Sequence, residues 1–366
     1  MYQIAKNKVD SQHVCAKASG MPVHYKTKRP ADRSADTASR PGKRAANGAA
    51  VQPAAEKTAG APRTGTVRDT IHFGIQRKIV ANMTSESWRA IPHCTYVYEA
   101  DVTSFLQACR RRNARHAQHA TLNTILLKVI CEGLKAAPIL NAHLTFQRRL
   151  VRGRIDTFEN IDISMPMILP GGEMMTVKLP DCGSKSLDEL TQAVGDIRRR
   201  AENTDFSQAM YDVSLQNTLN GLKHGRVLQA AFRLLGSKTG RHRVRTLHGG
   251  AKRAYMAVPE SERLTAKDLE QGTVTVSNLG SVYRAQTGQC TLLEIIPPQV
   301  AAFAIGAVQE RPSVVHWADG TKEIGVRSIL PITIAFDHRV FDFGDVAPFL
   351  KRLDEIFAAP SVVESW

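Results

Sequence analysis

The sequence predicts a mixed α/β domain of the sandwich type, preceded by a disordered arm. Along the chain, segments with apolar residues at helical spacing are interspersed with segments typical of strands. In the strand-like segments apolar and polar residues alternate, or apolar residues are continuous. This alternation lacks the regular strand–helix–strand period of a doubly wound sheet. Helices packed on a mixed sheet are therefore the predicted architecture.

The disordered arm is predicted for residues 1–65 and the folded domain for residues 66–366. The stretch from about residue 25 to residue 65 is rich in Ala, Pro, Gly and charged residues and almost free of large apolar side chains. Such a segment cannot bury enough apolar surface to offset the entropy lost on ordering. The arm is also basic, because it holds twelve Lys and Arg against four Asp and Glu.

The first half of the domain contains the clearest helix signals. Ile75, Ile79 and Met83 lie at helical spacing, which predicts a helix over residues 75–88. Listed in order, the next expected elements are a strand over 93–102, a helix capped by Thr103 or Ser104, a buried helix over 122–136 that ends before Pro138, strands within 155–180, and a helix from Ser186 to about Ala201.

The second half is predicted to complete the sheet after an insertion. Apolar runs predict strands at 273–276, 300–308 and 329–336, and helical periodicity predicts a closing helix at 346–357. Residues 213–258 hold nine Lys and Arg and no acidic residue, together with apolar residues at the spacing of an amphipathic helix or helix pair. This basic helical insertion either packs its apolar face on its own domain, docks a partner, or lies on a membrane surface.

The formal charge of +15 suggests a nucleic-acid partner at first sight, but its distribution argues against one. The arm and the insertion carry all of the excess positive charge, so the rest of the chain is close to neutral. A basic arm would bind RNA or an acidic partner, or would simply stay solvated. Nucleic acid is therefore the partner that ranks last.

Two further properties limit the class of protein. No apolar run approaches the 18 or so residues of a membrane span, and the N-terminus lacks the apolar segment of a secretory signal, so we expect a cytoplasmic protein. The six cysteines form no C-x-x-C pair, so we expect neither a metal site nor a disulfide framework, but reduced thiols in or near the core.

The strongest chemical signal is the run AFDHRVFD at residues 335–342, directly after an apolar strand. A histidine at a strand end can act as a general base if a neighbouring group fixes its tautomer, and a carboxylate four residues later can anchor the turn that does so. His338 and Asp342 have this spacing. The pattern alone is weak, because a single histidine is more often structural. The letters DFG at 342–344 mimic a kinase magnesium motif, but no Gly-rich phosphate loop or strand lysine precedes them.

Other segments make this signal specific. They are TVTVSNLG (273–280), EIIPPQVAAFAIGAV (294–308), and GIQRKIVANM followed by IPHCTYVYEADVT (74–83 and 91–103). Together with FDHRVFD and the helix that follows it, they resemble, in order, the catalytic domain of the dihydrolipoyl acyltransferases. These are the core subunits of 2-oxo acid dehydrogenase complexes, within the chloramphenicol acetyltransferase-like superfamily. The resemblance spans about 66–210 and 264–360.

The resemblance implies a reaction and a role for five residues. His338 would be the base that takes the proton from a thiol or hydroxyl as it attacks an acyl thioester, and Ser277 would donate a hydrogen bond to the oxyanion. Asp342 would be structural and paired with Arg77 or with Arg339. In this family the site lies between neighbouring subunits of a trimer, and transfer is direct, without an acyl-enzyme. Coenzyme A or its acyl thioester would be a substrate.

The chain also departs from the family pattern. Neither a lipoyl domain nor a subunit-binding domain is recognisable, and Phe343 stands where the family usually has Gly. Residues 167–180 stand where the family lines its substrate channel, and typical complex cores lack the basic insertion. The transfer chemistry is therefore expected, whereas the acceptor is open.

Three hypotheses follow. The first is a stand-alone acyltransferase that moves a short acyl group between coenzyme A and a thiol, hydroxyl or amine, on a small molecule or a carrier protein. The second is the core subunit of a 2-oxo acid dehydrogenase complex, served by a lipoyl group on another chain. The third is a non-catalytic trimeric scaffold, which would need none of His338, Asp342 and Ser277. All three predict a homotrimer or a multiple of three.

Overall fold

The computed structural model describes residues 65–168, 174–223, 246–317 and 319–366, with the side chains of 216–223 left out. Contacts divide the chain into two units, Met1–Val67 and Arg68–Trp366. All the described helices and strands belong to the second unit. The predicted arm, residues 1–65, falls almost entirely outside the described residues, so its disorder stays a prediction.

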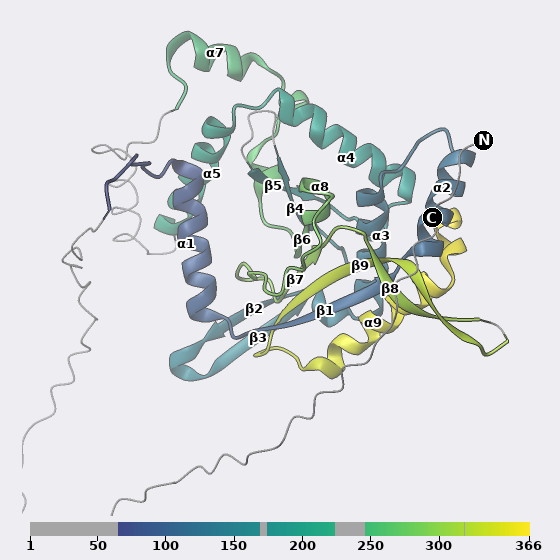
Figure 1. The fold of residues 1–366 in the computed structure, drawn as a ribbon. Coiled ribbons are helices and arrows are strands. Elements are labelled where there is room, and N and C mark those ends of the chain that lie inside the picture. The colour runs from purple at the N-terminus through teal and green to yellow at the C-terminus, as the bar shows by residue number, and fades with distance from the viewer. Residues whose placement is uncertain (1–64, 169–173, 224–245, 318) are drawn as a thin grey trace, which may run out of the picture. The chain divides into compact units, whose positions relative to one another are not determined.

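Helices and strands alternate irregularly along the second unit (Figure 1). The helices are α1 (Ile75–Ala90), α2 (Thr103–Arg115), α3 (Leu122–Ala136), α4 (Leu187–Glu202), α5 (Phe206–Lys223), α7 (Gly249–Ala257), α8 (Leu279–Val282) and α9 (Phe343–Ala358). The strands are β1 (His93–Asp101), β2 (Ala142–Gln147), β3 (Arg152–Thr157), β4 (Ile163–Ile168), β5 (Met174–Leu179), β6 (Val274–Asn278), β7 (Ala301–Ile305), β8 (Gln309–His316) and β9 (Lys322–Asp337).

A mixed sheet organises this unit. Among the described residues it has seven strands in the order β1-β9-β7-β6-β4-β5, with β8 paired to the first part of β9. β4, β6 and β7 run parallel to one another, whereas β1, β5, β8 and β9 pair antiparallel with their neighbours. β2 and β3 form a separate two-stranded ribbon. The predicted mixed α/β sandwich is confirmed.

Two helices bury their apolar faces against this sheet. α3 is buried along most of its length, as its near-continuous apolar sequence predicts. Phe349 of α9 stacks on Phe303 of β7 with ring centroids 5.1 Å apart, and Phe357 of α9 meets Phe105 edge to face at 5.0 Å. Each such side chain contributes about 1.5–3 kcal/mol by leaving water. The core between α3, α9 and the sheet therefore fixes the strand ends that carry the candidate site.

Local sequence signals explain several element boundaries. The expected helices over 75–88, over 122–136 and after Ser186 are confirmed. Ser186 forms a capping box with Glu189: its Oγ accepts from the Glu189 N–H at 3.2 Å, and its own N–H donates to the Glu189 carboxylate at 2.8 Å.

Two local predictions are wrong. Thr103 is the first residue of α2 and does not cap it, because its hydroxyl donates to Asp101 Oδ1 at 2.7 Å and accepts from the Ser328 N–H at 2.9 Å. β9 begins at Lys322, not near Ile329, and pairs with β8 in a hairpin that the sequence did not predict. The outer part of this hairpin is exposed, with Ile324 76% and Val326 72% accessible, so it lacks the buried apolar run that identifies a strand.

The insertion is only partly described. α5 extends into it as far as Lys223, and α7 lies near its end, whereas residues 224–245 fall outside the described part. The amphipathic helix predicted around 219–235 is therefore not tested. Among the described helices, none has both the length and the hydrophobicity of a membrane span.

Candidate active site

His338 lies one residue beyond the end of β9. Its backbone N–H donates to the Pro92 carbonyl at 3.2 Å, which ties the turn to the segment before β1. Its Nδ1 atom lies 3.2 Å from the Asp342 Oδ1 atom and 3.3 Å from the Phe341 carbonyl oxygen. The side chain is 53% exposed. The imidazole is thus held at one nitrogen and open to solvent at its other end.

The neighbours of Nδ1 determine the tautomer of His338. A carboxylate and a backbone carbonyl both accept hydrogen bonds, so Nδ1 must carry the proton that they share. In the neutral ring, Nε2 is then the unprotonated nitrogen. An exposed Nε2 with a free lone pair is the atom that a general base requires.

Arg339 makes an ion pair different from the expected one. Its Nε lies 2.9 Å and 3.1 Å from the two carboxylate oxygens of Asp337, and its Nη2 lies 2.6 Å from Oδ2. Asp337 is fully buried, so it needs this fork of donors, and the Arg339 backbone N–H supplies another at 3.0 Å. The pairing of Arg339 with Asp342 is therefore wrong, because the nearer, buried carboxylate takes the guanidinium.

Asp342 interacts with the helix start and with His338. Its backbone N–H donates to the Asp345 carboxylate at 2.9 Å, where it occupies the N-cap position of α9. Arg77 is exposed on α1 and forms no ion pair with Asp342 or with any other charged residue that the structure describes. The expected Arg77–Asp342 pair is absent from a single chain.

Ser277 is the fourth residue of β6, directly before a tight turn. Asn278 holds this turn: its Nδ2 donates to Asn123 Oδ1 at 2.7 Å, and its Oδ1 accepts from the Ser281 N–H at 2.8 Å. Gly280 lies so close to the end of β7 that a Cβ there would be 2.3 Å from the Gly306 carbonyl oxygen. Asn278 and Gly280 in the SNLG run are therefore explained by the turn and by the close approach to β7. These contacts fix the strand end at which the half-buried Ser277 lies.

The single chain does not bring Ser277 and His338 together. In the sheet register Ser277 is opposite Ala304, which is opposite Thr333, five residues before His338. Two strand spacings and five residues along a strand correspond to about 19 Å. Both side chains together are too short to meet at one reacting atom across that distance.

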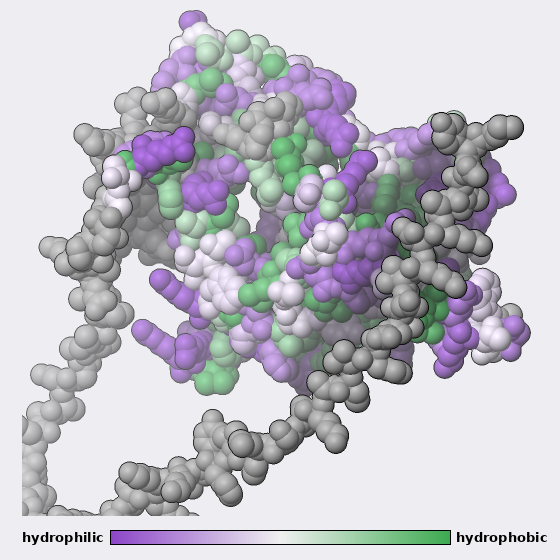
Figure 2. All heavy atoms as spheres, viewed as in Figure 1, coloured by the Kyte–Doolittle hydropathy of each residue, from purple (hydrophilic) through white to green (hydrophobic). Residues whose placement is uncertain are grey.

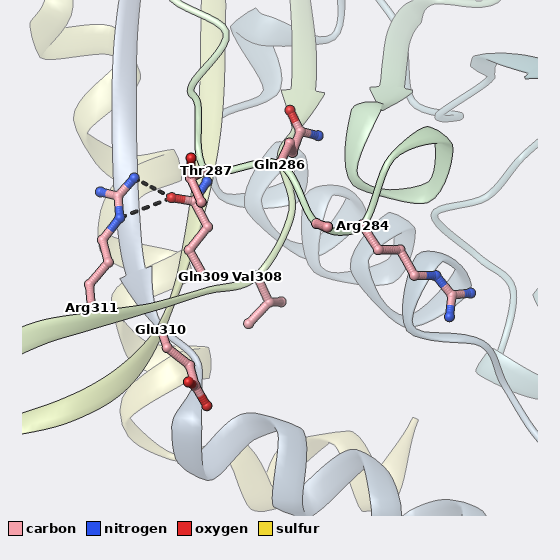
Figure 3. A pocket seen from close by; sticks show the side chains of 8 residues that line it. Arg284, Gln286, Thr287, Val308, Gln309, Glu310 and Arg311 are labelled. Atoms are coloured by element: carbon pink, nitrogen blue, oxygen red, sulfur yellow. Dashed lines mark hydrogen bonds between the residues drawn. The ribbon is translucent and has the colours of Figure 1, made fainter.

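A pocket of about 380 Å³ lies at the end of the sheet where β6 and β7 finish (Figure 3). It is lined by residues 284–287, which follow the Ser277 turn, and by residues 308–311. Arg311 is turned to Gln309, whose Oε1 accepts from its Nε at 3.0 Å and from its Nη2 at 2.5 Å. The pocket is thus associated with the end of the sheet that carries Ser277, not with His338.

The cysteines that the structure describes are structural in their surroundings. Cys109, Cys131 and Cys182 are buried free thiols, and Cys94 and Cys290 are half-buried, in line with the prediction of reduced thiols in or near the core; Cys15 is outside the described residues. Burial raises the pKa of the Cys109 thiol to about 12, which makes it a poor nucleophile. Across the ranges that the structure describes, no group of His, Cys, Asp and Glu side chains is arranged to hold a metal ion.

The chain matches the family model described as 2-oxoacid dehydrogenases acyltransferase (catalytic domain), over residues 65–213 and 252–363. The chain belongs to this family. The matched segments contain the His338 turn, Ser277 and all nine strands of this 2-oxoacid dehydrogenase acyltransferase domain, and the gap at 214–251 lies within the predicted insertion.

Curated relatives carry the same domain within longer chains. The chain is 25% identical over 284 residues to the dihydrolipoyllysine-residue acetyltransferase component of the pyruvate dehydrogenase complex of Mycobacterium bovis. That match covers 76% of this chain and 39% of the relative. The corresponding component of Zymomonas mobilis is 22% identical over 298 residues, with 81% of this chain and 51% of the relative covered. The chain thus spans about two fifths to one half of the length of these relatives.

Solved structures of the family have the same fold. The probable dihydrolipoamide acetyltransferase of Listeria monocytogenes superposes with a TM-score of 0.53 at 19% identity, covering 80% of this chain and 95% of that one. An Azotobacter vinelandii dihydrolipoamide acetyltransferase, studied for the role of a serine, a histidine and an asparagine in its catalytic mechanism, superposes with a TM-score of 0.55 at 18% identity, covering 83% and 99%. At these identities the likeness establishes the fold.

Two features near His338 were missed by sequence reasoning. One is the buried Asp337–Arg339 pair. The signal for it in the sequence was an Asp and an Arg on either side of His338, two residues apart. The other is an aromatic pair, Tyr96 and Phe343, with ring centroids 5.1 Å apart. Figure 2 shows hydrophobic and hydrophilic residues interleaved over the face in view, so no single apolar patch marks a site on that face. Tyr96 precedes the motif by more than two hundred residues, so only the β1–β9 pairing connects it to the site.

Proposed function

We propose that this protein transfers an acyl group between coenzyme A and a thiol, hydroxyl or amine acceptor, with His338 as the general base. The observation that carries the proposal is the arrangement at His338, where two acceptors hold Nδ1–H and leave Nε2 free and exposed. Membership of the acyltransferase family supports the reaction class.

In the proposed reaction, Nε2 of His338 takes the proton of the acceptor as the acceptor attacks the carbonyl carbon of the thioester. A new bond to carbon forms while the carbonyl π electrons move to oxygen, which gives a tetrahedral oxyanion. The hydroxyl of Ser277 donates a hydrogen bond to this oxyanion. Collapse of the intermediate re-forms the carbonyl, breaks the carbon–sulfur bond, and returns the proton from His338 to the sulfur of coenzyme A.

Because one chain separates Ser277 from His338 by about 19 Å, we propose that the two side chains of one site come from neighbouring subunits. The assembly would be a trimer or a multiple of three. Asp342 would hold the tautomer of His338, and Arg339 would hold the turn through Asp337. Arg77 receives no part in the single-chain site, because it is exposed and belongs to neither of these pairs.

A second candidate is the core subunit of a 2-oxo acid dehydrogenase complex that receives its acyl group from a lipoyl group on another chain. The curated relatives named above are components of the pyruvate dehydrogenase complex, which favours this candidate. The histidine and the asparagine named for the Azotobacter vinelandii enzyme are four positions apart, as are His338 and Asp342. Residues 1–65 and 213–258 would then serve as an arm and an insertion outside the catalytic unit.

The proposal is tested with a panel of acyl-coenzyme A thioesters, offered dihydrolipoamide and simple alcohols as acceptors, with release of free coenzyme A thiol as the readout. We expect transfer by the wild-type chain, a loss of about 10²–10⁴-fold in His338→Ala for want of the base, and a loss of about 10²–10³-fold in Ser277→Ala for want of an oxyanion donor.

His316→Ala is the matched control, because His316 is an exposed histidine at the end of β8. It should retain wild-type activity. Transfer at the wild-type rate by His338→Ala would remove the proposed mechanism, and no transfer with any thioester would favour a non-catalytic scaffold.

A further inference from the structure

Two half-exposed aromatic rings lie beside the His338 turn. Tyr96 of β1 is 38% exposed, and Phe343, the first residue of α9, is 48% exposed. Their ring centroids are 5.1 Å apart with the planes inclined at 58°, an arrangement in which each ring covers part of the other. Both residues keep part of their surface open to solvent.

The pair lies on the same face of the sheet as the imidazole. Alternate residues of β9 point to the same side, and the Phe336 and His338 rings meet edge to face at 6.3 Å. Tyr96 is opposite Ile334, two residues before Phe336, so it points to that same side. Phe343 directly follows Asp342, whose carboxylate holds His338 Nδ1 at 3.2 Å. The base and the two rings therefore lie on the same side of the sheet, in the region where α9 starts beside β1 (Figure 1).

Core packing does not account for this pair. Tyr98, two residues further along β1, shows what core packing looks like: its hydroxyl donates to Asp354 at 2.6 Å, and its ring stacks on Phe357. The later turns of α9 thus cover Tyr98, whereas the first residue of α9 leaves Tyr96 and Phe343 open. Exposed aromatic rings grouped next to a reactive side chain are a typical ligand surface.

The charges around the rings indicate which part of a substrate fits. The exposed Arg339 of the turn is already paired with Asp337, and Phe343 is flanked at the start of α9 by the exposed carboxylates of Asp342 and Asp345. They disfavour the phosphates of coenzyme A and leave the apolar rings as the attractive surface.

We infer that Tyr96 and Phe343 bind the apolar part of the acyl group, so that the enzyme prefers acyl groups longer than acetyl, either aliphatic or aromatic. This inference rests on the proposed acyl transfer. The rings lie near the base that deprotonates the acceptor as it attacks the carbonyl carbon, and the acyl chain begins at that carbon. Substitution of either ring would remove contacts with the acyl chain of the substrate and would leave the reacting atoms in place.

The test measures kcat/KM of Phe343→Ala, Tyr96→Ala and Phe343→Leu with acetyl-, hexanoyl- and benzoyl-coenzyme A and a small thiol acceptor. For each alanine variant we expect kcat/KM to fall about tenfold or more with the two larger acyl groups, which is the loss expected when an apolar contact of methylene size is removed. With acetyl-coenzyme A, which does not reach the rings, we expect a loss of less than about threefold. Phe343→Leu should recover the hexanoyl rate better than the benzoyl rate. Trp317→Ala, which removes an exposed aromatic ring from the β8–β9 hairpin, should leave all three rates unchanged.

Two outcomes would overturn the inference. One is an equal loss for all three acyl groups, accompanied by a change of assembly state in sedimentation, which would make the pair a subunit contact. The other is a gain for the larger acyl groups, which would make Phe343 a barrier to them. Absence of transfer by the wild-type chain would refute the proposed function instead, so the two failures are distinguishable.

Discussion

At the scale of single residues, the turn after β9 shows how a short motif orients the proposed base. The His338 imidazole is oriented by acceptors within the next four residues, and the buried Asp337–Arg339 pair holds the backbone that carries it. In the proposed mechanism Asp342 acts through His338 and is therefore a positioning residue. Its role depends on an oxygen acceptor at this position, whether or not that oxygen is charged.

The Asp342 acceptor can be tested by two substitutions. Asp342→Asn keeps an oxygen that can accept from Nδ1–H, so we expect kcat within about tenfold of wild type. Asp342→Ala leaves the Phe341 carbonyl as the sole acceptor, so we expect kcat to fall by about 10- to 100-fold with KM little changed. Steady-state kinetics with one acyl-coenzyme A checks both. Equal losses in the two variants, or loss explained by a lower unfolding temperature, would contradict a positioning role.

At the scale of elements, the close approach of α3 and α9 determines where the His338 turn lies relative to the sheet. Gly133 of α3 makes this approach possible, because a Cβ there would lie 2.6 Å and 2.7 Å from atoms of Phe349 and 2.8 Å from Leu353. Both of these α9 side chains are fully buried, so neither can move aside without disturbing the core.

Two glycine substitutions should therefore have opposite effects on stability. Gly133→Ala should lower the free energy of unfolding by about 1–3 kcal/mol through overpacking. Gly195→Ala, in an exposed part of α4 where nothing lies within 4 Å of the new Cβ, should raise it by about 0.5–1 kcal/mol through helix propensity. Urea unfolding at matched protein concentration measures both. A stabilised Gly133→Ala variant would mean that α9 is free to shift.

At the scale of the whole molecule, the proposed mechanism depends on the separation of His338 from Ser277. The register places Ser277 level with Thr333, whereas His338 is five residues further along β9. A site that needs both residues therefore needs two chains.

Mixing two inactive variants tests this shared site. A chain with His338→Ala still supplies Ser277, and a chain with Ser277→Ala still supplies His338. If subunits assemble at random, about a quarter of the sites in an equal mixture should combine both intact residues and recover activity. The mixture is prepared by co-expression and assayed against each variant alone. If each chain carries a complete site of its own, mixing recovers nothing.

The sequence determined the fold class, most helices and the candidate base, because these depend on local patterns. Helical spacing identified α1 and α3, and Ser186 with Glu189 marked the start of α4. The spacing of His338 and Asp342 within one turn was likewise visible in the chain itself. Strands were harder to predict where backbone pairing, and not burial of an apolar face, stabilises them. The exposed β8–β9 hairpin is the example.

Only the tertiary structure decided which distant residues meet. Arg339 had two carboxylates within three residues, and burial of Asp337 determined that it pairs there and not with Asp342, since a buried charge needs a partner far more than an exposed one does. The Tyr96–Phe343 pair and the distance between His338 and Ser277 both follow from strand register, which depends on pairings across the whole chain. Chemistry encoded within a single turn is therefore readable from sequence, whereas chemistry shared between strands, or between subunits, depends on how the sheet is assembled.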